Sequence, residues 1–208
     1  MRGEKNMNFS ESETKLNLMR AFAGESQARN RYTFAAEFAR EHGLYIVSDI
    51  FLFTANQELA HANVFYTHLK AFSGENITIT GGYPVEVFDN MLDILETAKH
   101  DELSEYESVY KNFAEVAKEE GFPEIAASFQ NIAKIEKVHS ARFDELLKLI
   151  KEDRLFKSDD KTIWFCTNCG HIQYTAEAPE KCPVCSHERG YFLKRELIPY
   201  TCEKIITV

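Results

Sequence analysis

Glutamate and histidine recur at short helical spacings in the first two-thirds of the chain. Glu58 is followed by His61, and Glu136 is followed by His139, with two residues between the members of each pair. Residues three apart lie on one face of a helix, so each pair can direct a carboxylate and an imidazole at one point. Oxygen and nitrogen ligands together suit iron or manganese. The two pairs therefore predict metal binding between two helices.

Three further glutamates fall where a hydrophobic core is expected. Glu25, Glu102 and Glu105 interrupt the apolar stripes of predicted helices, and these stripes carry no matching set of lysines or arginines. Burying even one unpaired carboxylate costs several kcal/mol. Five carboxylates carry five negative charges, which two ferrous ions nearly balance. Glutamates from two helices and Glu-x-x-His from two others form the ligand pattern of di-iron bundles, so we predict a di-iron site.

Two tyrosines are expected beside this site. Tyr32 lies seven residues after Glu25, and Tyr110 lies eight residues after Glu102, so we expect both tyrosines to lie near the site. Their hydroxyl groups can donate hydrogen bonds to ligand carboxylates. The alternative interpretation is that both are ordinary aromatic core residues.

Four cysteines form a second candidate metal site. Cys166 and Cys169 make one Cys-x-x-Cys pair, Cys182 and Cys185 make another, and twelve residues separate the pairs. This spacing is typical of tetrathiolate sites, in which either iron or zinc can be bound. A structural zinc ribbon is the alternative, but a one-electron iron centre has a use beside a di-iron site. Cys202 lies outside the pairs and is interpreted as a reduced thiol.

Helix-forming residues dominate up to about residue 150, and Gly and Pro mark the breaks. The predicted helices span 12–41, 46–72, 86–120 and 123–151. The first and third connections are short and predict antiparallel neighbours. The middle connection, 73–84, can span about 40 Å when extended, which is as long as a helix of about 25 residues. We therefore predict a ferritin-like four-helix bundle with one long crossover.

Charge and cysteine content divide the chain into two parts. Residues 1–155 hold 17 basic and 26 acidic residues, whereas 156–208 hold 7 of each and all the cysteines. We predict a mainly helical bundle domain over 1–155 and a small β-rich metal-binding domain over 156–208. The net charge of −9 disfavours nucleic-acid binding. No apolar run is long enough for a membrane span, and no secretory signal is evident, so a cytoplasmic protein is expected.

These motifs together resemble the rubrerythrin family, in which a ferritin-like di-iron bundle precedes a rubredoxin-like domain. The resemblance runs from about residue 12 to residue 193. The segment 23–32, Ala-Gly-Glu-Ser-Gln-Ala-Arg-Asn-Arg-Tyr, is similar to the family's first-helix signature, and the cysteine spacing matches.

The resemblance implies a role for each ligand. The implied bridging ligands are Glu58 and Glu136, one iron is served by Glu25 with His61 or Glu105, and the other iron is served by Glu102 and His139. The family pattern further implies that His61 and Glu105 exchange as ligands when the site changes oxidation state.

The implied activity is reduction of hydrogen peroxide to water by a non-haem di-iron peroxidase. Electrons would come from NAD(P)H through rubredoxin or a reductase. The rubredoxin-like iron of one chain would approach the di-iron site of the other in a homodimer. Candidate proton donors are Glu105, Tyr32 and Tyr110. The rival functions are an O₂-reactive iron-oxidising or storage protein, a zinc-stabilised interaction module, and a simple electron carrier.

Three features depart from the family pattern. Ser186 stands where a glycine usually follows the second cysteine pair, and a non-glycine residue tolerates the left-handed backbone poorly. The segment 194–208 is an extension, and the crossover is somewhat long. The length of the crossover is not expected to affect the chemistry, and the sequence assigns no function to the extension.

Overall fold

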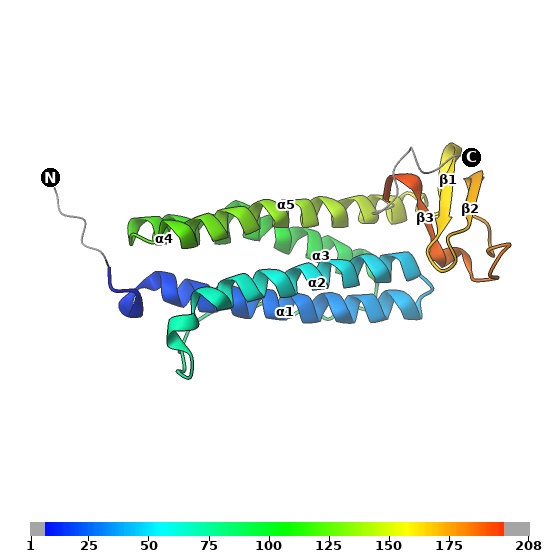
Figure 1. Cartoon of the computed structure of the whole chain (residues 1–208). Helices are drawn as coiled ribbons and strands as arrows, with labels where there is room; N and C mark the ends of the chain where they lie inside the picture. The colour runs from blue at the N-terminus through cyan, green and yellow to red at the C-terminus, as the bar shows by residue number, and fades with distance from the viewer. Residues whose placement is uncertain (1–6, 198–208) are drawn as a thin grey trace.

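The computed structural model describes residues 7–197 of the 208, and Cys202 therefore lies outside the described residues. Four long helical segments run side by side (Figure 1). Their bounds are α1 Glu13–Glu41, α2 Tyr45–His68, α3 Met91–Ser104 continued by α4 Tyr110–Glu119, and α5 Pro123–Lys151. A π-helical turn, Glu105–Val109, joins α3 to α4 without a break. The predicted ferritin-like helical bundle is confirmed.

Local side-chain chemistry sets where the helices begin. The Ser12 hydroxyl accepts a hydrogen bond from the Lys15 backbone N–H at 3.1 Å and caps α1. Asn90 caps α3 in the same way, which corrects the predicted start of the third helix from 86 to 91. The second predicted helix extended to residue 72, but α2 ends at His68 and a separate 3₁₀ turn follows at 70–72. Pro123 occupies the first turn of α5, where its missing N–H has no cost.

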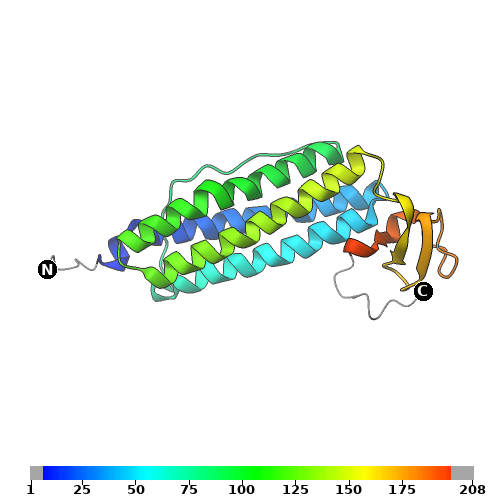
Figure 2. The ribbon, with the colours of Figure 1, turned by 90° about the horizontal axis from the view of Figure 1, so that it is seen from above.

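Residues 73–90 form the crossover, which runs along the length of the bundle (Figure 2). It allows α2 and α3 to run parallel, as the length of this connection predicted. Hydrogen bonds from α1 hold the crossover in place: Arg20 Nε donates to the Thr80 carbonyl at 2.9 Å, and Gln27 Nε2 donates to the Pro84 carbonyl at 2.8 Å. The Tyr83 hydroxyl donates back to the Arg20 carbonyl at 3.1 Å.

The bundle interior contains two separate hydrophobic clusters. One is built around Phe51, Leu95 and Phe143 and includes Tyr32. The other is built around Phe65 and Phe129 and includes Tyr110. The segment of bundle between the two clusters is filled by the polar side chains described below.

The predicted β-rich module lies at the end of the bundle where α1 turns into α2 (Figure 1). Strands β1 Lys157–Cys166, β2 Ile172–Glu177 and β3 Phe192–Lys194 form an antiparallel sheet in the order β2-β1-β3. Its small core is centred on Trp164 and Phe192. The Tyr191 ring stacks on Tyr45 of α2 with ring centroids 4.1 Å apart. Among residues 7–197, no helix is both long and apolar enough to cross a membrane.

Candidate metal centres

Six buried polar side chains converge from all four long helical segments between the two hydrophobic clusters. None is more than 6% exposed, and they comprise Glu25 of α1, Glu58 and His61 of α2, Glu102 of α3, and Glu136 and His139 of α5. We call this group the carboxylate–histidine cluster. Because an α-helix completes a turn in 3.6 residues, the Glu-x-x-His spacing places both ligands of α2, and both of α5, on the inward face.

The cluster divides into two sets of four potential ligands. One set is Glu25, Glu58, His61 and Glu136, and the other is Glu58, Glu102, Glu136 and His139. Within each set the ligand atoms lie within 4.8 Å of one another. Two residues, Glu58 and Glu136, belong to both sets. This arrangement has the form of two adjacent ion sites with shared carboxylates.

The contacts inside the cluster fit metal ligation better than hydrogen bonding. His139 Nδ1 lies 2.9 Å from Glu58 Oε1 and 2.8 Å from Glu136 Oε2. All three atoms are nevertheless buried without a hydrogen-bond partner, because their directions do not suit a hydrogen bond. In the described part of the chain, the ion pairs of the four cluster glutamates are made only with the two histidines. Convergent, unpartnered oxygen and nitrogen atoms are what a pair of divalent ions would satisfy.

The electrostatics of the cluster agree with this interpretation. Burial raises the pKa of Glu25 and of Glu102 well above the ordinary value. Burial also opposes ionisation of Glu58, but contacts with His139 and His61 lower the pKa of Glu58 to about 2. Burial lowers the pKa of His139, yet contacts with Glu102 and Glu136 outweigh it and raise that pKa to about 11. In the absence of metal, protons bound to Glu25, Glu102 and His139 therefore offset the negative charge of the cluster. A metal ion must displace these protons when it binds.

Each predicted tyrosine joins one hydrophobic cluster to the polar site. The Tyr32 hydroxyl donates to Glu102 Oε1, and the Tyr110 hydroxyl donates to Glu25 Oε1. Burial raises the pKa of both phenols, so both remain donors at neutral pH. Each hydroxyl fixes the orientation of a carboxylate that belongs to only one of the two ligand sets.

The two halves of the cluster are related by an approximate repeat. Tyr32 follows Glu25 by seven residues, whereas Tyr110 follows Glu102 by eight. In a regular α-helix the extra residue would rotate Tyr110 by about 100° away from the site. The π turn at 105–109 accommodates this residue, since a π turn closes with one residue more than an α turn. Both tyrosines therefore face the cluster.

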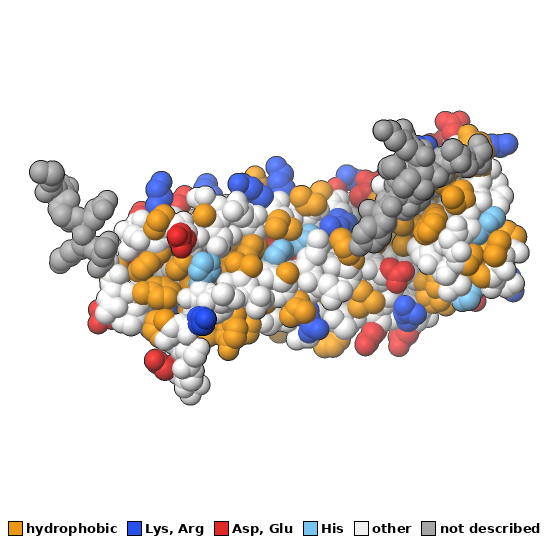
Figure 3. Space-filling view, in the orientation of Figure 1, with side chains coloured by type: hydrophobic (Ala, Val, Ile, Leu, Met, Phe, Trp, Pro, Cys, Tyr) orange, Lys and Arg blue, Asp and Glu red, His pale blue; other side chains and the backbone are white. Residues whose placement is uncertain are grey.

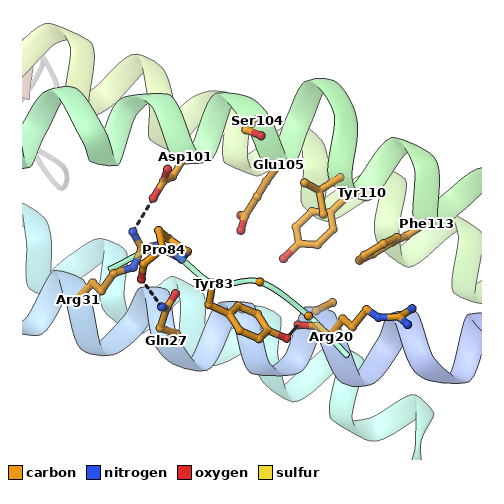
Figure 4. A pocket seen from close by; sticks show the side chains of 15 residues that line it. Arg20, Gln27, Arg31, Tyr83, Pro84, Asp101, Ser104, Glu105, Tyr110 and Phe113 are labelled. Carbon is orange, nitrogen blue, oxygen red and sulfur yellow. Dashed lines mark hydrogen bonds and ion pairs between the residues drawn. The ribbon is translucent and has the colours of Figure 1, made fainter. Parts of the chain in front are cut away.

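Glu105, the seventh predicted ligand, lies outside both ligand sets. It is half-buried and lines a cavity of about 360 Å³ together with Tyr110 and Tyr83. Figure 4 shows the Glu105 carboxylate directed into this space, which we call the access cavity. Burial and the charge of Glu25 raise the pKa of Glu105. His61 occupies the ligand set instead, with Nδ1 2.9 Å from Glu136 Oε1.

Two polar side chains near His139, Gln57 and Arg142, were not predicted from the sequence. The ring Nε2 of His139 donates to Gln57 Oε1 at 3.1 Å, and Arg142 Nη1 donates to the same oxygen at 3.0 Å. Arg142 also donates to the Thr54 hydroxyl at 2.8 Å. An acceptor on the outer nitrogen keeps Nδ1 free to bind a metal ion, as is usual for metal-ligating histidines. The indication that the sequence offered for Gln57 is its position directly before the predicted ligand Glu58.

The four cysteines of the two pairs lie together as their spacing predicts, and none forms a disulfide. Cys166 Sγ lies 3.8 Å from Cys185 Sγ, and Cys169 Sγ lies 3.6 Å from Cys182 Sγ. Sulfurs at about 2.3 Å from a metal in a tetrahedron are about 3.8 Å apart. The group, which we call the tetrathiolate site, therefore fits one metal ion.

Two similar turns build the tetrathiolate site. The Gly170 N–H donates to the Cys166 carbonyl at 2.8 Å, and the Ser186 N–H donates to the Cys182 carbonyl at 2.9 Å. Gly170 has φ 79° and Ser186 has φ 63°. Ser186 thus adopts the left-handed backbone conformation that its position in the sequence indicated. This conformation costs free energy for a residue with a Cβ atom, compared with glycine.

Comparisons with known proteins agree with both centres. The rubrerythrin family model matches residues 17–147, and that of the rubrerythrin rubredoxin-like domain matches residues 164–193. The rubrerythrin of Clostridium perfringens is 48% identical over 182 residues, covering 87% of this chain and 93% of the relative. The rubrerythrin of Nitratidesulfovibrio vulgaris is 39% identical over 181 residues, covering 87% and 93%.

Solved structures give the same result. Fully reduced, all-ferrous nigerythrin superposes with a TM-score of 0.60 at 29% identity, covering 91% of this chain and 92% of that one. A Desulfovibrio desulfuricans bacterioferritin, at 24% identity and a TM-score of 0.62, covers 68% of this chain and 82% of that one, and supports the ferritin-like fold alone. With a carboxylate–histidine cluster in a ferritin-like bundle and a rubredoxin-like tetrathiolate site, this chain belongs to the rubrerythrin family.

Proposed function

We propose that this chain is a di-iron peroxidase that reduces hydrogen peroxide to water. The observation that carries the proposal is the buried carboxylate–histidine cluster, whose two ligand sets share Glu58 and Glu136, beside a cavity bordered by Glu105 and Tyr110. Two ferrous ions bound in the cluster would supply the two electrons that, with two protons, convert one hydrogen peroxide to two water molecules.

The residues of the cluster have distinct proposed roles. The shared ligands are Glu58 and Glu136, the ligands of one ion are Glu25 and His61, and the ligands of the other are Glu102 and His139. The two tyrosine hydroxyls hold the single-ion carboxylates in position. Because Glu105 lies on the cavity side of the cluster, we propose that it takes the place of His61 when the oxidation state changes.

Glu105 is the proposed proton donor to the departing oxygen. Its carboxyl group faces the access cavity (Figure 4), from which a peroxide would approach. Burial raises its pKa, so this carboxyl group holds a proton more readily than an exposed glutamate does and can supply it as a general acid. Tyr110 and Tyr32 are second candidates, because each hydroxyl already holds a proton beside a ligand carboxylate.

The tetrathiolate site is proposed to return electrons one at a time. Iron is the proposed metal because it changes its charge by one electron, whereas zinc, which also fits four thiolates, does not. The proposed source of the electrons is NAD(P)H, through rubredoxin or a reductase.

The location and the domain bounds are also part of the proposal. Unpaired thiols persist in a reducing compartment, so we propose a cytoplasmic location. The proposed domains are 1–155 and 156–208.

A homodimer would shorten the electron path. Within one chain, Tyr45 of α2 contacts the β-rich module. The distance along the α2 axis from Tyr45 to Glu58 is about 20 Å. Electron transfer slows exponentially with distance, so we propose that the tetrathiolate site of a second copy serves the cluster. Exposed apolar side chains for such a contact lie on α2 and α5, namely Leu52, Phe53, Leu59, Val64, Tyr66, Ile135 and Val138. Figure 3 shows hydrophobic side chains along this face of the bundle.

Anaerobic stopped-flow absorbance tests the proposal. Fully reduced protein is mixed with hydrogen peroxide or, separately, with O₂, and ferric–thiolate colour reports reoxidation. We expect peroxide to act much faster than O₂. Faster reaction with O₂ would favour an oxidase, and a colourless tetrathiolate site would favour zinc. The variant Glu136→Ala should lose both cluster irons and peroxide turnover but keep the ferric–thiolate colour. Turnover that survives in this variant would contradict the mechanism.

A further inference from the structure

The access cavity is larger than hydrogen peroxide requires. Its volume is about 360 Å³, and a water molecule occupies about 30 Å³ in the liquid. Hydrogen peroxide has only two heavy atoms and would fill a small part of this space. Cavities of this size are typical of sites that enclose small organic molecules.

The lining of the cavity favours a neutral ligand with an apolar part. At one end the guanidinium charge of Arg31 is paired with Asp101, and Gln27 donates to the Pro84 carbonyl, so the positive charge at this end is neutralised within the protein. Arg31 also pairs with Glu86. The remaining lining includes the apolar surfaces of Ala21, Val109, Phe113 and the ring of Tyr83. Figure 4 shows Glu105 and Tyr110 between the two ends.

Gly24 keeps part of this space open. It lies within α1, where glycine destabilises a helix relative to alanine because of its backbone entropy. A Cβ atom added at Gly24 would meet only Tyr83 Cε1, at 3.8 Å, which is an ordinary contact. Neither the backbone nor local packing therefore requires glycine here. What its missing side chain provides is room in the cavity between α1 and the crossover.

We propose that the access cavity admits small organic hydroperoxides as well as hydrogen peroxide. The alkyl or aryl group would lie against Val109, Phe113 and Tyr83, and the O–O group would point toward Glu105 and Tyr110. This inference rests on the proposed function and widens its substrate class. The O–O bond breaks as ROOH takes up two electrons from the reduced protein and two protons, and it yields ROH and water.

Cumene hydroperoxide is a suitable probe, and its product, cumyl alcohol, can be measured by chromatography. Reduced holoprotein is mixed with cumene hydroperoxide or with hydrogen peroxide in single-turnover experiments. The test variant is Gly24→Leu, whose side chain would fill the cavity, and Gly24→Ala is the matched control. A second variant, Gly82→Leu, narrows the same cavity from the crossover, where an added Cβ meets nothing within 4 Å. Calorimetric binding of cumyl alcohol to the oxidised protein gives a readout that does not depend on turnover.

We expect one cumyl alcohol per two electrons in the parent protein. In Gly24→Leu the rate constant for cumene hydroperoxide relative to that for hydrogen peroxide should fall about tenfold or more, with a parallel loss of cumyl alcohol binding. The Gly24→Ala change should be much smaller. If the parent protein reduces hydrogen peroxide but not cumene hydroperoxide, or if both leucine variants keep the original ratio, the inference is wrong and the peroxidase proposal stands. If the protein reduces neither compound, the proposed function itself fails.

Discussion

Replacing Gln57 with leucine should weaken one of the two ion sites selectively. Gln57 Oε1 accepts hydrogen bonds from His139 Nε2 and Arg142 Nη1, at 3.1 and 3.0 Å. His139 belongs to only one ligand set, with Glu102 as the other unshared member. Without the acceptor, the imidazole loses the contact that directs Nδ1 at the metal, and Arg142 keeps only its bond to Thr54.

Two independent arguments give the size of this effect. Loss of a hydrogen bond to a charged or metal-polarised group costs about 1.5–3 kcal/mol. Removing the outer partner of a metal-ligating histidine typically lowers metal affinity about 10–100-fold, which corresponds to about 1.4–2.7 kcal/mol. We therefore expect one cluster iron to be released to a ferrous chelator about 10–100 times faster than in the parent protein.

Anaerobic chelation measures this release directly, and the colour of the tetrathiolate site serves as an internal standard. Ile135 is the matched control, because it precedes Glu136 as Gln57 precedes Glu58, and its side chain is apolar and 38% exposed. Ile135→Ala should leave both release rates unchanged. Gln57→Glu retains an oxygen acceptor and should restore most of the affinity. Equal release from Gln57→Leu and the parent protein, or no rescue by Gln57→Glu, would refute the assigned role.

Three further predictions concern stability and docking. Ser186→Gly should raise the free energy of unfolding of the β-rich module by about 1 kcal/mol, because Ser186 has a left-handed φ of 63° that glycine adopts without strain. Thermal denaturation measures this change, and a lower free energy of unfolding in the variant would contradict the prediction. Gly190→Ala should release the module from the bundle, since the new Cβ would lie 1.9 Å from the Gly43 carbonyl oxygen; limited proteolysis between the two parts should accelerate. Glu120→Gln should destabilise the bundle by about 1 kcal/mol at pH 7, because the carboxylate accepts hydrogen bonds from the Thr14 N–H and hydroxyl at 2.8 and 2.6 Å. Burial opposes ionisation of Glu120, but these bonds lower its pKa, so its contribution is present above the unfolded-state pKa and the difference between parent and variant should disappear as the pH falls through the lowered value. A pH-independent difference in denaturant unfolding would exclude this cause.

Patterns within single helices predicted the bundle and the residues of the carboxylate–histidine cluster. Acidic residues on apolar stripes are visible in the sequence because the helical period fixes which residues share a face. The start of α3 was wrong because Glu-Val-Phe-Asp at 86–89 is compatible with a helix locally. Val87 is 90% exposed, however, and no packing supports a helix there, so the cap at Asn90 decides the boundary.

Features that depend on contacts between helices were not predictable in this way. The bond from His139 to Gln57 joins α5 to α2, and its existence depends on how these helices are placed across the bundle. The π turn likewise has no distinctive residue pattern. Its only trace is the spacing of eight between Glu102 and Tyr110, compared with seven between Glu25 and Tyr32. That trace becomes meaningful only once both hydroxyls are known to face one site.

The two halves of the cluster, one containing Glu25 and His61 and the other containing Glu102 and His139, have different surroundings. Three residues after Glu25 stands Ala28, which is buried in the core, whereas three residues after Glu102 stands Glu105, which faces the access cavity. The cavity also borders Tyr110, which donates to Glu25, so it opens toward the half that contains His61. The other half contains His139, which Gln57 holds in place. The half that faces the cavity thus contains His61, the ligand that we propose Glu105 replaces, while His139 in the opposite half is held by Gln57. An oxidant that enters through the cavity would therefore meet the adaptable side of the cluster first.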